Sequence, residues 1–380
     1  MATYRNPWDL PLSERLLMLQ KGRKRVAYFY EKPDSSTFRY RVYNMAQVLN
    51  DGEGDISASY FFLSDVASFH EIADSADMLV ICRARYDANI NHLITAFRRK
   101  GKKILFDVDD LIFNPDFVHL IVRTLGINMG IQKHWDDWFA YSSRIGETLL
   151  KCDGVIATNE YLADRIRDFS RLPTTVIPNF LNKEQVDVSS QLFDSKQQRL
   201  SESKAGVQLG YFSGSATHAK DLAIALPFLE ALMEETPSLS LTVAGYIQLD
   251  SLVKRFGSHR VKYLRFTDFI NLQRLISEVD FNLVPLQYNA FSHCKSELKY
   301  FEAAVVGTQT IASPTFTYAN VIRDGDNGYL SKAYEWDVVI KRAMDALPCA
   351  VKMAERARDD ALKNFAWYHQ KSIILKALGS

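Results

Sequence analysis

The chain has 380 residues, of which 47% are hydrophobic, and a formal net charge of +1 at pH 7. This length exceeds one ordinary α/β core and predicts two domains, while the near-neutral charge gives no electrostatic reason to expect a nucleic-acid partner. Four scattered cysteines without a Cys-x-x-Cys pair disfavour a zinc site or a disulfide framework. The sequence shows neither a signal-peptide pattern nor a membrane-spanning apolar run, so we expect a cytoplasmic protein.

Predicted helices and strands alternate through the N-terminal half of the chain. Residues 12–19 form an amphipathic helix followed by cations, which predicts a helix packed on the domain. The alternative is a helix on a membrane surface, with the protein at the inner face of the membrane. The further predicted elements are strand 26–30, helix 39–49, strand 78–82, helix 90–99, strand 103–107, strand 154–158, helix 160–169 and strand 175–177. This alternation predicts a largely parallel sheet covered by helices.

A second series of strands and helices follows the polar stretch 182–204, which we predict to be a connector. Its predicted elements are strand 209–212, helix 221–235, strand 240–244, strand 261–264, helix 271–278, strand 281–284 and strand 310–312. We therefore expect an α/β protein with two Rossmann-like domains, an N-terminal domain at residues 1–185 and a C-terminal domain at residues 205–355. A final helical segment is expected at residues 356–380.

The most informative stretch is residues 296–330. It combines a helix that carries Glu302 and ends at Gly307, a short strand, and the glycine turn 324–328. Such close spacing predicts one edge of an α/β sheet with a ligand at its rim. The stretch resembles the donor-binding signature of retaining nucleotide-sugar glycosyltransferases with the GT-B fold, the family-4 group. The resemblance implies two Rossmann-like domains that face each other across a cleft, with the last helix crossing back onto the first domain.

Glu302 is the strongest candidate in this stretch. The resemblance implies that it accepts hydrogen bonds from the ribose hydroxyls of the nucleotide, which suits a carboxylate because it offers an acceptor to each hydroxyl. The alternative is a surface acid paired with Lys299. Lys295 would share the face of Glu302 on an extended helix, so we expect it at the diphosphate. Glu297 is rotated roughly 140° away, in the first helical turn, and is a further substrate-binding candidate.

Ser296 is predicted to cap the helix, so that the free amides of Glu297 and Leu298 form an anion site. His293 and Cys294, just before it, are expected to contact the donor; the alternative is a capped surface loop. The resembled family carries a second glutamate where this chain has Cys294. A thiol cannot accept sugar hydroxyls as a carboxylate does, so we hypothesise that Cys294 contacts a donor sugar lacking a hydroxyl.

Residues 210–221 run from a predicted strand through small residues into a helix. The resemblance implies that Lys220 neutralises the diphosphate, whereas the arginine that the family also uses there is missing. Gly214 and the hydroxyl of Ser215 are expected to approach phosphate closely. The alternative for Lys220 is a solvated lysine at a helix start.

The first domain offers candidates for the acceptor side of the cleft. Asp107, Asp109 and Asp110 follow a predicted strand, and clustered carboxylates suit Mg²⁺. We nevertheless expect no metal, and an acceptor-side or structural role for Asp109. Arg39 is expected to meet phosphate or acceptor hydroxyls, with a surface arginine as the alternative, and His119 is a further candidate in the cleft.

These residues predict a retaining glycosyltransferase of hexosyltransferase type. Its partners would be a nucleoside-diphosphate sugar as donor and a glycan or lipid-linked saccharide as acceptor, with no separate cofactor and with peripheral membrane contact left open. One alternative is a nucleotide-sugar epimerase of the same fold. The other is a non-catalytic nucleotide-sugar-binding or scaffold protein, in which the missing glutamate and arginine mark lost activity.

Overall fold

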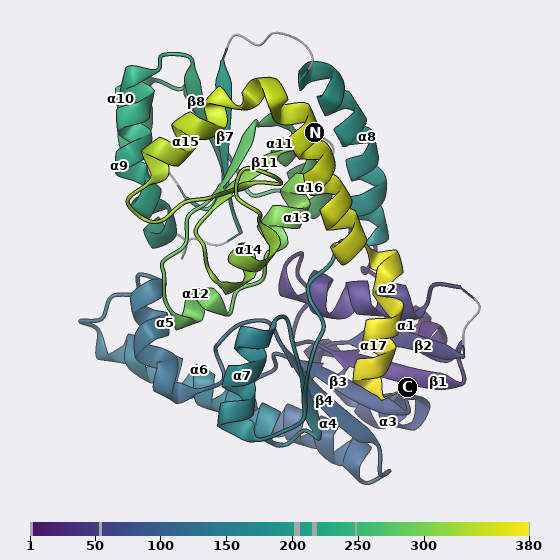
Figure 1. The fold of residues 1–380 in the computed structure, drawn as a ribbon. Coiled ribbons are helices and arrows are strands. Elements are labelled where there is room, and N and C mark those ends of the chain that lie inside the picture. Colours follow the sequence, from purple (N-terminus) through teal and green to yellow (C-terminus); the bar gives the residue numbers. More distant parts are fainter. Residues whose placement is uncertain (1–2, 53–54, 201–205, 215–218, 248, 380) are drawn as a thin grey trace.

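The computed structural model describes residues 3–52, 55–200, 206–214, 219–247 and 249–379, the side chains of residues 199 and 200 excepted. The chain forms two domains, each built on a parallel sheet of six strands (Figure 1). The strands of the first sheet are β1 (Lys24–Phe29), β2 (Ile56–Phe61), β3 (Met78–Cys82), β4 (Lys103–Val108), β5 (Gly154–Ala157) and β6 (Thr174–Val176). Those of the second are β7 (Val207–Ser213), β8 (Leu239–Gly245), β9 (Val261–Leu264), β10 (Phe281–Val284), β11 (Gln309–Ala312) and β12 (Tyr329–Leu330).

Helices cover both sheets. In the first domain and the connection they are α1 (Leu12–Leu19), the π-helical turn Arg39–Tyr43, α2 (Asn44–Leu49), α3 (Phe69–Ser75), α4 (Ala88–Arg98), α5 (Val118–Thr124), α6 (Gln132–Leu150), α7 (Glu160–Ser170) and α8 (Lys183–Leu200). In the second domain and the tail they are α9 (Ala219–Glu235), α10 (Asp250–Phe256), α11 (Phe269–Glu278), α12 (Ala290–His293), α13 (Leu298–Ala304), α14 (Phe316–Val321), α15 (Trp336–Asp345), α16 (Ala350–Phe365) and α17 (Lys371–Leu378). Short 3₁₀ turns lie at Leu63–Ser68, Pro115–Phe117, Leu347–Cys349 and Trp367–His369.

The strand orders fix where ligands can bind. The first sheet runs β2-β1-β3-β4-β5-β6 and the second β12-β11-β10-β7-β8-β9. Chain order therefore reverses between β1 and β3 in the first sheet and between β7 and β10 in the second. In doubly wound sheets the crevice at such a reversal, beyond the carboxyl ends of the strands, is the usual ligand site. Both sheets contribute side chains from this end to one cavity between the domains. The predicted architecture of two Rossmann-like domains facing across a cleft is confirmed.

Several elements were not predicted, among them β2, α6 and α8. Strand β2, at the edge of the first sheet, is buried along its whole length although it carries Ser57 and Ser59, and these polar residues interrupt the apolar run expected of a buried parallel strand. Helix α6 also went unnoticed in the sequence. The stretch predicted as a polar connector contains helix α8, whose polar side chains include the buried Gln185, Ser189 and Lys196. These residues bond to distant parts of the chain, such as Thr308 Oγ1, 2.5 Å from Lys196 Nζ.

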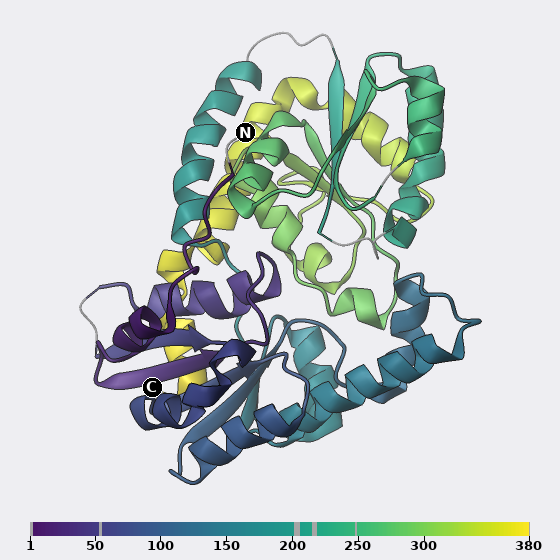
Figure 2. The ribbon, with the colours of Figure 1, turned by 180° about the vertical axis from the view of Figure 1, so that it is seen from behind.

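The two ends of the chain tie the domains together. The N-terminal segment reaches the second domain (Figure 2). There the Tyr4 amide donates to Asp268 Oδ2 at 3.1 Å, and Trp8 stacks on Phe269. At the other end, α16 packs on α13 of the second domain, and the chain then crosses so that α17 lies against α2 of the first domain (Figure 1). The crossing falls at Ala366, where residue Leu181 of the other interdomain connection forms a parallel bridge.

Helix α1 packs on the first sheet through buried Leu19 and Arg15, whose guanidinium is held by both carboxylate oxygens of Asp65, at 2.6 and 3.0 Å. On the outer side of this helix, Leu17 is 64% exposed. Among the described helices, none combines the length and apolar character needed to cross a membrane.

Candidate active site

A cavity of about 330 Å³ lies between the domains, at the carboxyl ends of both sheets. The first domain lines it with the loop after β1, the start of the π-helical turn, and residues that follow β3 and β4. The second domain lines it with the ends of β7, β8 and β10 and with one face of α13. Of the residues predicted for the site, the cavity brings together Arg39, Asp109, Gly214, Lys295, Ser296, Leu298 and Glu302.

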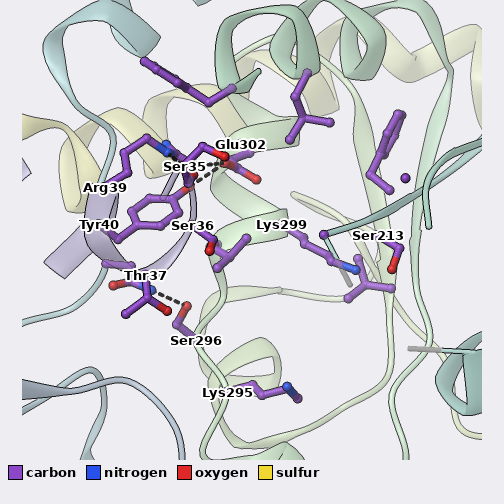
Figure 3. Close-up of a pocket in the computed structure, with 18 of the residues that line it drawn as sticks. Ser35, Ser36, Thr37, Arg39, Tyr40, Ser213, Lys295, Ser296, Lys299 and Glu302 are labelled. Atoms are coloured by element: carbon purple, nitrogen blue, oxygen red, sulfur yellow. Dashed lines mark hydrogen bonds and ion pairs between the residues drawn. The ribbon is translucent and has the colours of Figure 1, made fainter. Parts of the chain in front are cut away.

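Glu302 faces the first domain from α13 and is only 3% exposed (Figure 3). Its Oε1 atom accepts hydrogen bonds from the hydroxyl of Tyr40, from Arg39 Nη2 at 3.4 Å and from Gln185 Nε2 at 3.3 Å. Among the described residues, none donates a hydrogen bond to the other oxygen, Oε2. One carboxylate oxygen is thus held by protein donors, and the second is left for a ligand hydroxyl.

The π-helical turn Arg39–Tyr43 presents the first-domain partners of Glu302. A π turn places successive side chains at an unusual spacing and often occurs at functional sites. The Arg39 guanidinium lies 4.0 Å from the centroid of the Tyr40 ring and also donates to Gln185 Oε1 at 2.7 Å and to the Ser35 carbonyl at 2.8 Å. These bonds fix the orientation of both side chains, so the first domain presents a preorganised pair of donors to Glu302.

Lys299 lies one turn before Glu302 and also lines the cavity (Figure 3). Its Nζ atom is 5.0 Å from the centroid of the Tyr211 ring, and no acid of the described chain forms an ion pair with it. Burial lowers its pKa to about 8, and the neighbouring charge of Lys295 acts in the same direction. Lys299 was considered in the sequence only as a partner of Glu302, yet it supplies an ammonium group directed at the cavity, suited to an anion.

Lys295 is the second ammonium group of the cavity. It lies 4.7 Å from the centroid of Phe291 and 3.9 Å from Asp110 Oδ1. The two lysines and the partly paired Glu302 therefore surround one space. This space suits a ligand that carries both an anionic group and a diol.

The predicted N-cap at Ser296 is wrong. Helix α13 begins at Leu298 and has no side-chain cap. The Ser296 hydroxyl instead accepts a hydrogen bond from Asn179 Nδ2 of the first domain, at 2.9 Å. The hydroxyl therefore serves an interdomain contact rather than a helix cap. Lys295 lies outside the helix for the same reason.

Cys294 is not at the cavity. It is fully buried and belongs to a hydrophobic cluster built mainly from first-domain residues, with Phe291 beside it. Its carbonyl oxygen accepts a hydrogen bond from Asn159 Nδ2 at 2.8 Å. The hypothesis that this thiol contacts a deoxysugar donor is therefore wrong: the position packs the second domain onto the first, and an acid there would lack solvent and partners.

His293, Glu297, His119 and Lys220 also lie away from the cavity lining. His293 Nδ1 accepts the Phe316 amide at 2.9 Å, and His119 is exposed on α5. Lys220 Nζ donates to the carbonyl oxygen of Arg123 in the first domain, at 2.9 Å. Its role at the diphosphate stays a prediction.

Glu297 lines a different cavity, on the far side of α13. Ser215 lies outside the described residues. Neither position adds a described side chain to the site around Glu302.

The acids after β4 are each paired with cations. Asp107 is fully buried and held by Arg41 through two bonds, at 2.8 and 2.9 Å; burial raises its pKa despite this partner. Asp109 lines the cavity and accepts from Thr37 Oγ1 at 2.8 Å and Arg83 Nη1 at 3.0 Å. Burial acts to raise the pKa of Asp109, but Arg83 and the Thr37 hydroxyl outweigh it and lower the pKa.

The described residues contain no group of three or more histidine, cysteine, aspartate or glutamate side chains arranged to hold a metal ion. The acids of this run are instead paired with Arg41 and Arg83. The absence of a metal in the reaction stays a prediction.

Residues 208–347 match the family model described as "Glycosyl transferases group 1". No curated protein sequence matches the chain. Several solved structures share its fold. Alr3699/HepE of Anabaena, in complex with UDP and glucose, is 15% identical, with 93% of this chain and 99% of that chain covered and a TM-score of 0.62. Sucrose-phosphate synthase of Thermosynechococcus elongatus is 14% identical, covering 93% and 97%, with a TM-score of 0.62.

WaaG, a glycosyltransferase involved in lipopolysaccharide biosynthesis, is 12% identical, with 93% of this chain and 100% of that chain covered and a TM-score of 0.62. Identities this low show the fold, and the family match lies within the second domain. The chain has the GT-B fold, and residues 208–347 are similar to group 1 glycosyltransferases.

Proposed function

We propose that the protein transfers a sugar, with retention of configuration, from a nucleoside-diphosphate donor to a glycan or lipid-linked saccharide. The observation that carries the proposal is the cavity beside the reversal point of the second sheet, where Glu302 keeps one oxygen free and two lysines lie close by. The free Oε2 is suited to a ribose hydroxyl and the ammonium groups to a diphosphate. Support also comes from Alr3699/HepE, which has been solved with UDP and with UDP-glucose.

Each wall of the cavity has a distinct task in this proposal. As the bond from the sugar to the diphosphate breaks, negative charge grows on the leaving group, where Lys299 and Lys295 stabilise it. The acceptor approaches from the first domain, past Asp109 and Arg83. Because donor and acceptor are enclosed between two domains, water is excluded and donor hydrolysis is suppressed.

The carboxyl end of β7, in the second sheet, completes the donor side of the cavity. Gly214 carries no side chain, and a Cβ added there would meet no atom of the described residues within 4 Å, so the backbone at the end of β7 can be approached by a ligand. Peripheral membrane contact of α1 and the lipid-linked nature of the acceptor remain predictions from the sequence.

A panel of nucleotide sugars, beginning with UDP-glucose and other UDP sugars, tests the proposal. Binding is first measured by calorimetry, and each binding sugar is then incubated with candidate acceptors. We expect transfer with retained anomeric configuration, read by NMR of the product. Interconversion of the donor sugar without an acceptor would instead indicate an epimerase, and nucleotide binding without turnover would indicate a binding protein.

A further inference from the structure

A second cavity, of about 440 Å³, lies on the face of α13 opposite the donor cavity, and the two share no lining residue. The first domain lines it with the start of α7 and the end of β6. The second domain lines it with the base of α13, with α14 and with α16. This cavity therefore also lies between the two domains, but behind the helix that carries Glu302.

Glu297 is the distinctive group in this second cavity. It is 6% exposed and accepts a hydrogen bond from its own backbone amide, but no cationic side chain of the described residues forms an ion pair with it. Burial raises its pKa to about 7, although the backbone hydrogen bond acts in the opposite direction. The hydroxyl of Tyr300, three residues further on and lining the same cavity, is buried and has no hydrogen-bond partner among the described residues. A buried carboxylate without a cation is costly unless something else occupies its surroundings.

Several other polar groups of the cavity have partners. Arg323 donates to Asp360 Oδ2 and to Asp326 Oδ2, both at 2.7 Å. Thr317 Oγ1 donates to the Lys295 carbonyl at 2.8 Å, and Asn159 is fixed by the Cys294 carbonyl. Glu297 is therefore the charge of this cavity that no described group balances.

We propose that the second cavity binds a small organic ammonium ion, which pairs with Glu297 and rests against aromatic side chains. A carboxylate only accepts hydrogen bonds, so its best partner is a charged donor. Tyr300, Phe316 and Phe365 line the same cavity, and aromatic faces attract ammonium groups. An inorganic divalent cation would need several oxygen ligands, whereas this cavity supplies one unpaired carboxylate.

The binding should depend on pH in a defined direction. An ammonium ion pairs with the ionised form of Glu297, so its affinity should rise as the pH increases from 6 to 8, with proton release on binding near pH 7. The charged groups that face Glu297 do not reverse this. Arg323 and Asp360 are paired with each other, and burial raises the pKa values of Tyr300 and Tyr318.

The test uses the full chain and putrescine as the ammonium probe, with 1,4-butanediol as the uncharged probe of the same length. Calorimetry should show saturable binding of putrescine, strengthening at least five-fold from pH 6 to pH 8, and no binding of the diol. Glu297→Gln should abolish it, whereas Glu278→Gln, at an exposed acid outside both cavities, should leave it unchanged. The Gln variant keeps the size of the side chain and removes an unpaired charge, so folding is expected and is checked by thermal unfolding.

Two results would overturn the proposal: putrescine that fails to bind at pH 8, or binding that Glu297→Gln leaves intact. This site does not depend on the donor. A failure of nucleotide sugars to bind would refute the proposed function and leave the ammonium site standing, and the reverse also holds.

Discussion

The hydroxyl of Tyr40, in the first domain, donates a hydrogen bond to Oε1 of Glu302, in the second domain, 262 residues away in the chain. The acid expected to hold the ribose is thus oriented by the opposite domain. Its ligand-binding oxygen is in place only when the two domains are together. If Glu302 binds the ribose as we propose, nucleotide binding should be coupled to domain closure, because each orders the same carboxylate.

Tyr40→Phe should weaken UDP binding about ten-fold, since a hydrogen bond to a charged group contributes about 1.5–3 kcal/mol. Calorimetry with UDP and 2′-deoxy-UDP provides the measurement. The loss should be smaller for the deoxy compound if Tyr40 acts through the ribose contact of Glu302. Tyr43→Phe is the matched control, because that hydroxyl, on the same turn, bonds to Glu184 at 2.7 Å, outside the cavity. Equal losses for both ligands would contradict the positioning role.

Glu302→Gln and Glu297→Gln form a second matched pair. Glu297 immediately precedes α13 and Glu302 lies on it, and only Glu302 lines the donor cavity. We expect Glu302→Gln to weaken nucleoside-diphosphate binding at least ten-fold, on the order of one charged hydrogen bond, and Glu297→Gln to leave it within about two-fold. Unchanged affinity in Glu302→Gln, with an intact fold, would remove this residue from the site.

Lys299 should give donor binding a pH dependence. Its pKa is lowered to about 8 in the free protein, and only the protonated form attracts a diphosphate. Affinity for UDP should therefore fall as the pH rises from 7 to 9.5, and Lys299→Met should lower the affinity about ten-fold at pH 7 and flatten the profile.

Lys220→Ala, measured in the same UDP titrations, tests the expectation from the sequence that Lys220 neutralises the diphosphate. Its ammonium group lies on the Arg123 carbonyl, so the geometry predicts a smaller loss than for Lys299. A larger loss in Lys220→Ala would show that this side chain moves into the site when the nucleotide binds.

Turnover should not require a divalent metal, because two lysines and the open backbone after β7 are available for the diphosphate, and the acids after β4 are committed to arginines. Activity should persist in EDTA. Loss of activity in EDTA that Mg²⁺ or Mn²⁺ restores would overturn this prediction.

Glu297 should also shape the pH dependence of stability. Its folded-state pKa of about 7 lies above the unfolded value of about 4.3. Its stabilising effect is therefore full below about pH 4.3 and is lost as the pH rises towards 7, by roughly 3–4 kcal/mol in total. The free energy of unfolding of the wild type, relative to Glu297→Gln, should fall over this range in urea titrations. A constant difference from pH 4 to pH 8 would contradict it.

Much of the fold was readable from the sequence because most strands are short, apolar and flanked by turns. Strands β3, β9 and β10 were predicted at the residues where they occur. Helix α8 was not, because several of its buried side chains are polar and find their partners in other elements. Local patterns carry no information about such distant partners.

The candidate site was only partly readable for a related reason. Motif spacing pointed to Glu302, and the cavity confirms that it faces the cleft. No motif in the sequence singled out Tyr40 or Lys299. The one available hint was that Lys299 lies near the start of the predicted helix that carries Glu302. Cys294 was misassigned because a position in a motif was taken as a contact, whereas here it packs one domain on the other.

The two chain crossings between the domains lie side by side. Leu181, in the first crossing, bonds through its amide to the carbonyl of Phe365, in the second, at 2.8 Å, and pairs with Ala366. Two adjacent connections between the same domains favour rotation of the domains about one axis and resist twisting and sliding. We therefore expect each opening and closing movement to follow the same path and to return the Tyr40 hydroxyl to Glu302.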